Sequence, residues 1–262
     1  MSGGTPQIGS LKRTLAMLEA VIADGGCSSV TELARQTGTP PATAHRQVTT
    51  LVAENYLVAT CNGRHVAGAR LLGLLHRLDE KQILASVAAP LLHELAARVP
   101  GAVQLGTFEN DMVTYRIKTG RGARALFTRI GMQLEAYCSG IGKVLLTNLP
   151  QPEREAYLAG GPFVPLTERT IVDPRRLREE LDAVREQGFA LDDEEIAGGL
   201  RCLAVPLRRP DGLVLAAISV SQMTSSRNRM EDAPLLALLR HTAQAIEWQA
   251  FGGVRARLPL VN

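Results

Sequence analysis

Apolar residues near the start of the chain recur at the spacing of an amphipathic helix. The stripe contains four residues separated by four, three and four positions: Leu11, Leu15, Leu18 and Ile22. We expect this helix to end at the glycine pair Gly25-Gly26. Ser29 and Glu32 then have the spacing of a capping box, which predicts the start of a second helix with Leu33 and Ala34 facing inward.

A third helix follows a glycine turn. Gly38 suits the left-handed backbone of that turn, Thr39 is the expected N-cap, and Pro40 or Pro41 fits the first helical turn. At 100° per residue the inner face holds Ala44, Val48 and Leu51. The opposite face contains no acid and holds Arg46 flanked by Ala42, Thr49 and Thr50, with Thr43 at its edge.

An alternating strand pattern over residues 56–60 and 65–67 surrounds Asn62-Gly63, a strong hairpin turn signal. Two helices around a glycine turn, followed by a hairpin, predict a winged helix-turn-helix, which places a helix in the major groove of DNA. Arginine can read guanine, and threonine can contact phosphate or a thymine methyl. We predict DNA contacts from Arg13, Thr39, Ala42, Thr43, His45, Arg46, Gln47, Thr49, Arg64 and His65. The alternative is a helical pair that serves only packing or dimerisation.

Charge placement agrees with a DNA-binding amino-terminal part. The chain has 262 residues and a net charge of +3. Residues 1–78 hold seven Lys/Arg and four Asp/Glu, so they carry the whole surplus, and residues 79–262 sum to zero. The four cysteines show no CxxC spacing, no apolar run is long enough to span a bilayer, and no signal peptide is present. We therefore expect a soluble cytoplasmic protein without a cofactor, metal or membrane partner.

Beyond the hairpin, the pattern predicts a linker helix and a mixed sheet domain. Residues 69–82 are so rich in leucine that we expect packing against a partner chain. Further helices are expected over 84–99, 139–148, 173–188 and 232–251. Strands are expected over 102–108, 112–118, 125–130, 202–207 and 213–220. This mixed order predicts an α+β fold rather than a doubly wound sheet.

Several blocks resemble the IclR family of bacterial transcriptional regulators. They are Glu32-Leu33-Ala34, Thr43-Ala44-His45-Arg46, Ser139-Gly140-Ile141-Gly142-Lys143-Val144-Leu145-Leu146, Thr167-Glu168-Arg169-Thr170-Ile171 and Gly199-Leu200-Arg201-Cys202-Leu203-Ala204-Val205-Pro206. The resemblance implies a winged helix-turn-helix domain (8–68), a linker helix (69–82) and a GAF-like effector-binding and oligomerisation domain (83–253). It also implies homodimers, or dimers of dimers, on palindromic double-stranded operators. In the recognition helix, Ala44 and Gln47-Val48 stand where members of the family more often have Val or Ile and a Leu-Leu pair. No operator sequence can therefore be carried over from relatives.

A polar patch is expected inside the sheet domain. If Arg209 pairs with Gly212, Cys202 lies opposite Ser219, Leu200 lies opposite Ser221, and the cysteine and both serines share one face. Matching positions of the family's effector pocket are Leu126, Gly140, Ile141, Asp192, Cys202, Ser219 and Ser221. Because a helix that begins after Ser139 offers free N–H groups, a small organic acid is the expected effector. The alternative is that both serines bond to backbone and Cys202 is ordinary core.

Two other functions are considered. A redox- or metal-responsive regulator would use Cys138, Cys202 and Asp192 if they converge. An enzyme with an appended DNA-binding module would need a base near Cys138 or Cys202, and only His241 lies in or after the sheet domain. We expect no catalytic site. The acid-free run Arg116, Lys118, Arg121, Arg124 and Arg129 is either a solvated strand edge or part of an anion site.

Overall fold

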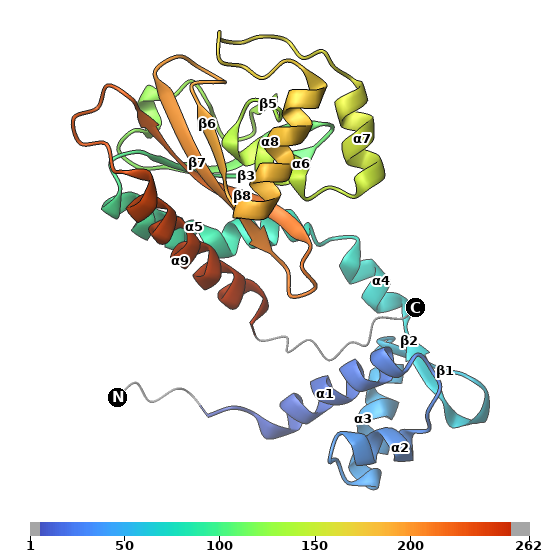
Figure 1. The fold of residues 1–262 in the computed structure, drawn as a ribbon. Coiled ribbons are helices and arrows are strands. Elements are labelled where there is room, and N and C mark those ends of the chain that lie inside the picture. Colours follow the sequence, from blue (N-terminus) through green and yellow to red (C-terminus); the bar gives the residue numbers. More distant parts are fainter. Residues whose placement is uncertain (1–5, 253–262) are drawn as a thin grey trace. The chain divides into compact units, whose positions relative to one another are not determined.

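The computed structural model describes residues 6–252, and the chain divides after Asp79 into an N-terminal unit and a unit that begins at Glu80 (Figure 1). The predicted end of the second domain at residue 253 lies outside the described residues. Within residues 6–252, no helix combines the length and apolarity needed to cross a membrane.

The N-terminal unit is a winged helix-turn-helix. Its helices are α1 (Gly9–Asp24), α2 (Val30–Gln36), α3 (Pro41–Ala53) and α4 (Ala69–Leu75), and its hairpin strands are β1 (Leu57–Ala59) and β2 (His65–Ala67). The capping box of Ser29 and Glu32 is present, Gly38 has the predicted left-handed conformation, and α1 ends at the glycine pair with Gly25 as its C-cap. The hairpin pairs Val58 with Val66. These predictions are confirmed.

The apolar stripe predicted for α1 lies on the wrong face. Met17 and Val21 are the buried residues of α1 in the core with α2 and α3, and Leu18 is the member of the predicted stripe that packs against this core. Leu11, Leu15 and Ile22 are 54, 50 and 41% exposed. The helix therefore turns its strongest leucine stripe outward, because Met17 and Val21 fill the space between α2 and α3.

Two further details differ from the sequence predictions. The helix α3 begins at Pro41 with Pro40 as its N-cap, and Thr39 makes no capping bond but is buried, 3.2 Å from the Thr37 hydroxyl. Pro41 already supplies a first residue without an N–H to satisfy. The expected helix over 69–82 ends at Leu75, and α5 (Glu80–Arg98) begins after a short connection.

The C-terminal unit is built on a six-stranded antiparallel sheet in the order β5-β4-β3-β8-β7-β6. Its strands are β3 (Ala102–Glu109), β4 (Met112–Thr119), β5 (Gln133–Glu135), β6 (Ala190–Asp193), β7 (Leu200–Arg208) and β8 (Val214–Met223). Its other helices are α6 (Gly140–Thr147), α7 (Gln151–Ala159), α8 (Pro174–Gln187) and α9 (Asp232–Phe251). The α+β prediction is confirmed.

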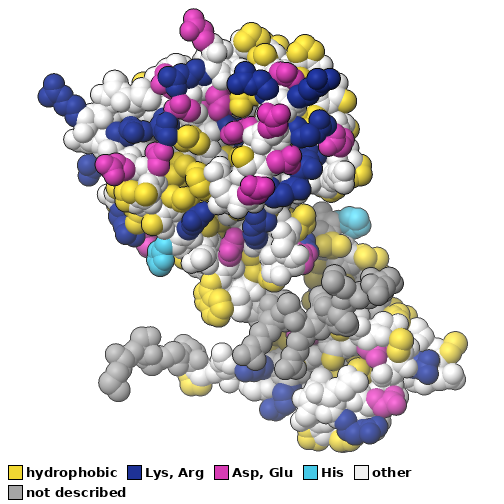
Figure 2. Space-filling view, viewed as in Figure 1, with side chains coloured by type: hydrophobic (Ala, Val, Ile, Leu, Met, Phe, Trp, Pro, Cys, Tyr) yellow, Lys and Arg dark blue, Asp and Glu magenta, His cyan; other side chains and the backbone are white. Residues whose placement is uncertain are grey.

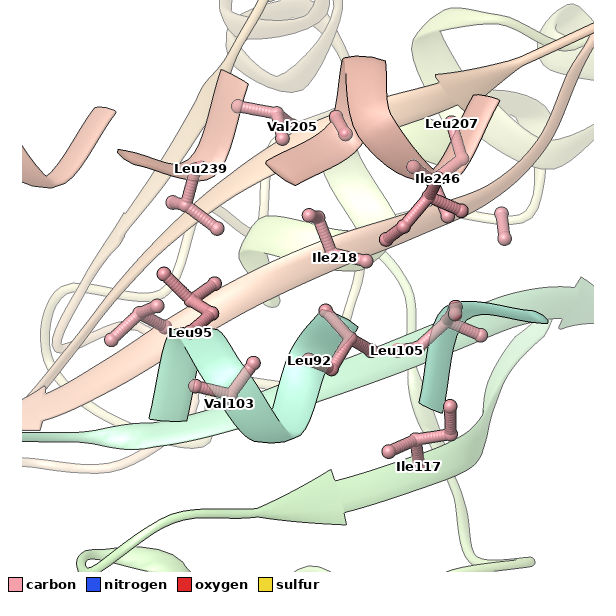
Figure 3. Packing of buried hydrophobic residues seen from close by; sticks show 14 of the residues in the cluster. Leu92, Leu95, Val103, Leu105, Ile117, Val205, Leu207, Ile218, Leu239 and Ile246 are labelled. Atoms are coloured by element: carbon pink, nitrogen blue, oxygen red, sulfur yellow. The ribbon is translucent and has the colours of Figure 1, made fainter. Parts of the chain in front are cut away.

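Helices cover both faces of this sheet. On one face α5 and α9 pack against alternate strand residues such as Leu105, Val205 and Ile218 (Figure 3). On the other face α6 and α8 pack against the intervening residues, among them Tyr115 and Cys202. The alternation of side chains therefore gives the unit two cores, and the candidate pocket lies on the face of α6.

Three sheet predictions need correction. Residues 125–130 form no strand; a short 3-10 turn (Ala123–Ala125) precedes an irregular segment, and the edge strand is β5. The elements α7 and β6 were not expected. The hairpin register differs by two, because Arg209 N–H bonds to Leu213 across a longer turn and a bulge follows Leu207, so Cys202 pairs with Ser221. A two-residue shift keeps every side chain on its face.

Candidate DNA-binding face and effector pocket

The outer face of α3 presents its polar side chains to solvent. Arg46 and His45 are exposed, and Arg46 forms no ion pair within the described part of the chain. The Thr49 hydroxyl donates to the carbonyl of His45 at 2.9 Å, and the Thr50 hydroxyl bonds to that of Arg46 at the same distance. Each threonine therefore offers its methyl group outward unless its hydroxyl changes partner.

The structure separates the ten predicted DNA contacts into two groups. Exposed or half-buried residues are Arg13, Ala42, Thr43, His45, Arg46, Thr49, Arg64 and His65. Thr39 and Gln47 are buried, with 4 and 8% of their surface exposed, and Gln47 lies beside Ala44 and Val48 on the inner face. The side chains of these two residues therefore pack inside the N-terminal unit and are not presented on its outer surface.

The wing carries a histidine beside the recognition helix. Burial lowers the pKa of His65, and the charge of His45 lowers it further. Its Nδ1 is buried and has no hydrogen-bond partner in residues 6–252. The neutral ring of His65 therefore packs the wing near His45, while Arg64 at the tip stays exposed.

A narrow polar pocket lies between the sheet and the start of α6. All seven predicted effector residues line it: Leu126, Gly140, Ile141, Asp192, Cys202, Ser219 and Ser221. The residues that sequence reasoning missed are Gln104, Tyr115, Phe127, Thr128, Ser139, Ile196 and Leu200. The free space between these side chains is about 10 Å³, which suits a single water molecule. A larger ligand requires part of the wall to move.

Asp192 is the charged group of this pocket. Its side chain is fully buried, and Oδ1 accepts the N–H groups of Glu195 at 2.8 Å and Ile196 at 3.4 Å. The other oxygen, Oδ2, is buried without a hydrogen-bond partner in the described residues. Burial raises the pKa of Asp192 to about 7, and the nearby Glu195 adds to the increase. A ligand hydroxyl or a shared proton would satisfy Oδ2.

The two serines do not match the alternative in which both hydroxyls bond to the backbone. The Ser221 hydroxyl donates to Gln104 Oε1 at 3.1 Å, and Gln104 Nε2 donates to the Thr128 hydroxyl at 2.9 Å. The Ser219 hydroxyl has no hydrogen-bond partner among the described residues, although Ser219 is 2% exposed. Burial raises the pKa of the Cys202 thiol, so it is a neutral donor beside Asp192 and Ser221.

The start of α6 supplies donors to the same space. Ser139 caps this helix by accepting the N–H of Gly142 at 3.1 Å. The N–H groups of Gly140 and Ile141 have no backbone partner in the described chain. A side chain at Gly140 would lie 3.3 Å from the Cys202 carbonyl, so glycine lets the helix approach β7 closely. An anion in the pocket would meet two free N–H groups and the positive end of α6.

A buried ion network holds the pocket wall that contains Asp192. Lys143 Nζ is 2.8 Å from Glu180 and 2.6 Å from Glu195, and it also bonds to the Leu191 carbonyl. Burial alone would lower the pKa of Lys143, but Glu195 and Glu180 raise it, so the ammonium stays charged. The Thr170 hydroxyl donates to the Glu195 carbonyl at 2.7 Å. Two of the sequence blocks, those that contain Lys143 and Thr170, therefore meet at Glu195 beside Asp192.

The other two functional hypotheses gain no geometric support. Within residues 6–252, no group of three or more His, Cys, Asp or Glu is arranged to hold a metal ion. Burial also raises the pKa of the Cys138 thiol, which disfavours its reactive thiolate. His241 lies on α9, across the sheet from Cys202, so it cannot act as its base.

Charges on the C-terminal unit are mixed. Basic and acidic side chains are interspersed over the face of this unit seen in Figure 2, as expected from the balanced charges of residues 79–262. Many form ion pairs, such as Arg201 with Asp193 and Asp232, both at 2.6 Å. This face therefore lacks the basic surplus that binding to DNA requires.

Comparison with known proteins identifies both units. Residues 10–60 match the IclR helix-turn-helix domain, and residues 76–248 match the bacterial transcriptional regulator IclR C-terminal domain. The HTH-type transcriptional regulator XynR of Escherichia coli is 31% identical over 242 residues, which cover 92% of this chain and 95% of that protein.

Solved structures agree. The Agobacterium tumefaciens repressor BlcR aligns with a TM-score of 0.67 and 27% identity over 93% of this chain and 97% of its own. An IclR homolog from Microbacterium hydrocarbonoxydans, solved with 4-hydroxybenzoate, aligns with a TM-score of 0.61 and 27% identity over 92% and 99% of the two chains. The chain described here therefore belongs to the IclR family of bacterial transcriptional regulators.

Proposed function

We propose that this cytoplasmic regulator binds a palindromic operator as a homodimer or a dimer of dimers, and that a small organic acid in the C-terminal pocket controls this binding. The observation that carries the proposal is the set of unsatisfied groups in the narrow pocket. Asp192 Oδ2 is buried without a partner in the described residues, and the Ser219 hydroxyl and the free N–H groups at the start of α6 lie around the same space. Buried polar groups without partners are costly, and a bound acid would supply the missing bonds.

A carboxylate fits this set in one orientation. Its oxygens would accept the N–H groups of Gly140 and Ile141 and the Ser219 hydroxyl, which line the same pocket. Asp192 repels a second carboxylate when it is ionised but bonds well to a hydroxyl or an acid proton. The preferred class is therefore a small carboxylic acid with a neutral polar group opposite the carboxylate. The homolog solved with 4-hydroxybenzoate bears a ligand of this class.

A thermal-shift screen of small organic acids, with 4-hydroxybenzoate included, tests the effector. An acid that binds is expected to raise the melting temperature of the parent protein, and Ser219→Ala is expected to weaken that rise. Ser86→Ala, an exposed serine of α5 that bonds to its own helix, is the matched control. A rise of equal size in Ser219→Ala contradicts the proposed pocket.

A mobility-shift assay on the DNA upstream of the gene tests the operator. Arg46→Ala is expected to weaken binding by about 1–3 kcal/mol, the value of one good arginine–guanine contact. Arg176→Ala, an exposed arginine of α8, is the control and should bind like the parent. The effector is expected to change operator affinity by about 1–3 kcal/mol, the usual size of such coupling. Operator binding that survives Arg46→Ala unchanged argues against the assigned recognition face.

A further inference from the structure

The pocket has almost no free space, and two irregular segments, the turns after Asp192 and residues 126–130, form part of its wall. Strands and the start of α6 form most of the lining, and the Lys143 network holds the segment after Asp192. The other irregular segment is Leu126–Ile130, which we call the cover segment. Leu126, Phe127 and Thr128 line the pocket from within, while Phe127 and Ile130 are 47 and 66% exposed. The cover segment therefore separates the pocket from solvent.

Two neighbouring strand residues hold the cover segment shut. Gln104 Nε2 donates to the Thr128 hydroxyl at 2.9 Å. Lys118, the cross-strand partner of Gln104, donates to the Leu126 carbonyl at 2.9 Å and also to the Thr128 carbonyl. The cover segment is held by fewer hydrogen bonds than the strands of the sheet. It is therefore the part of the pocket wall that opens at the lowest free-energy cost.

A basic hollow of about 420 Å³ lies outside the cover segment. Its lining combines cations with apolar side chains: Lys118, Arg124 and Arg129 with Leu126, Phe127 and Ile130. In the described residues none of the three cations forms an ion pair. Burial lowers the pKa of Lys118, and the charge of the nearby Arg129 lowers it further. An anion would relieve the repulsion between these two cations.

We propose that the basic hollow is an entry site for small organic anions, and that the cover segment is the door between this hollow and the pocket. The inference rests on the proposed function in that the pocket receives an organic acid. The cations concentrate anions at the surface, because unpaired charges of one sign raise the local concentration of the opposite charge. The apolar side chains of Phe127 and Ile130 suit the hydrocarbon part of the same molecule.

Gln104 links the door to the pocket contents. Its Oε1 accepts the Ser221 hydroxyl inside the pocket, while its Nε2 holds Thr128 of the cover segment. A ligand that takes the Ser221 hydroxyl frees one end of Gln104, so occupancy changes the strength of the latch. Gln104 therefore bonds both to a residue that a ligand would contact and to the cover segment.

Alkylation of Cys202 tests entry without any knowledge of the effector. Iodoacetate and iodoacetamide have nearly the same size, differ in charge, and react alike, since the thiolate displaces iodide. The background Cys27→Ser/Cys61→Ser removes the two exposed thiols. Peptide mass spectrometry then follows Cys202 in the pocket and Cys138, which is buried outside it, as an internal control. Because both reagents need the same thiolate, the ratio of their rates reports charge alone.

Loss of the hydrogen bond between Gln104 and Thr128, the latch of the cover segment, should admit both reagents. In the full-length chain, Thr128→Val is expected to raise both rates at Cys202 roughly fivefold or more, since opening becomes more frequent, and to leave Cys138 unchanged. Thr128→Ser keeps the hydroxyl and should react like the parent. Gln104→Met serves as a second latch variant if the valine protein folds poorly. No increase at Cys202 in either latch variant, or an equal increase at Cys138, overturns the door.

Loss of the cations should affect the anionic reagent alone. Arg124→Gln/Arg129→Gln is expected to lower the iodoacetate rate at Cys202 roughly threefold to tenfold relative to iodoacetamide, and added salt should reduce the difference. The control Arg176→Gln should change neither rate. An unchanged ratio of the two rates overturns the entry site. The proposed effector class is tested separately by the acid screen, so entry can hold even if no acid in that screen binds.

Discussion

Asp192 is the residue whose ionisation matters most for this protein. Its pKa is about 7 in the folded chain against an ordinary value of 3.8, because the carboxyl is fully buried. Between these two values the folded protein holds a proton that the unfolded chain has released. The stability contributed by this carboxyl is present in full below pH 3.8 and is lost as the pH rises through 7.

Asp192→Asn should remove this dependence. The free energy of unfolding of the variant, relative to the parent, is expected to rise between pH 4 and 7 and to level off above that range. The change is at most about 4 kcal/mol, from 1.36 kcal/mol per unit of pKa. Urea unfolding at a series of pH values measures it. Glu179→Gln removes an exposed carboxyl of α8 and provides the control. Parallel profiles for parent and Asp192→Asn would show that the carboxyl is not protonated in the fold.

The same proton should control the effector. An organic anion is expected to bind the parent protein more weakly above pH 7, since the ionised carboxylate of Asp192 then repels it. Asp192→Asn should lose this pH dependence, while Ser219→Ala should keep it with lower affinity throughout. Calorimetric titration of an acid found in the screen separates the two effects.

At the scale of elements, Lys143 joins α6, α8 and the segment after β6. Lys143→Met leaves Glu195 and Glu180 without a buried counter-charge, so we expect a loss of about 3–5 kcal/mol in the free energy of unfolding. Lys143→Met/Glu195→Gln should cost less than the sum of its two single variants, because both belong to one network. Denaturant unfolding measures this cycle.

The surface pair Arg70–Glu54 offers a contrast for the Lys143 cycle. Its side chains are 47 and 61% exposed at a distance of 3.0 Å. Removing it should cost less than about 1 kcal/mol. If Lys143→Met costs no more than Glu54→Gln, which removes the surface pair alone, the buried network does not stabilise the pocket wall.

The elements differ in how far sequence could predict them. The capping box of α2, the Gly38 turn and the start of α6 after Ser139 depend on neighbouring residues, and all were predicted correctly. Gln104 was missed as a pocket residue because it reaches Ser219 through the pairing of β3 with β8, more than a hundred residues apart. Thr128 was missed because a strand was expected where an irregular segment lies. The buried face of α1 was wrong because periodicity alone does not show which of two apolar stripes meets α3.

The pocket prediction tolerated a wrong register. Cys202 pairs with Ser221 rather than Ser219, yet all three side chains stay on the face of α6. An error of two residues preserves the alternation of a strand, whereas an error of one would have moved both serines to the face of α5. The parity of these positions, more than the exact pairing, made the pocket predictable.

At the scale of the whole molecule, the N-terminal unit exposes apolar side chains that a monomer does not need. On α4 and just after it, Leu72, Leu75 and Leu78 are 60, 64 and 59% exposed, in addition to the leucine stripe of α1. Such an apolar surface is typical of an interface. Arg70 ties the start of α4 to α3, through its bonds to Glu54 and its position 4.8 Å above the Tyr56 ring. A dimer joined through α4 would therefore hold two recognition helices at a fixed spacing and orientation.

Leu72→Glu/Leu75→Glu should break this dimer. We expect sedimentation to show a smaller oligomer than the parent, because two carboxylates in an apolar interface are costly to bury. Operator affinity should fall strongly although the fold is little perturbed. The reason is that the N-terminal surplus of three positive charges is small for one copy. Val164→Glu, at an exposed valine of the C-terminal unit, is the control and should leave both properties unchanged. A variant that keeps the parent's oligomeric state but loses operator binding would place the leucines at the DNA-binding function itself, and one that keeps both would leave α4 without a role in assembly.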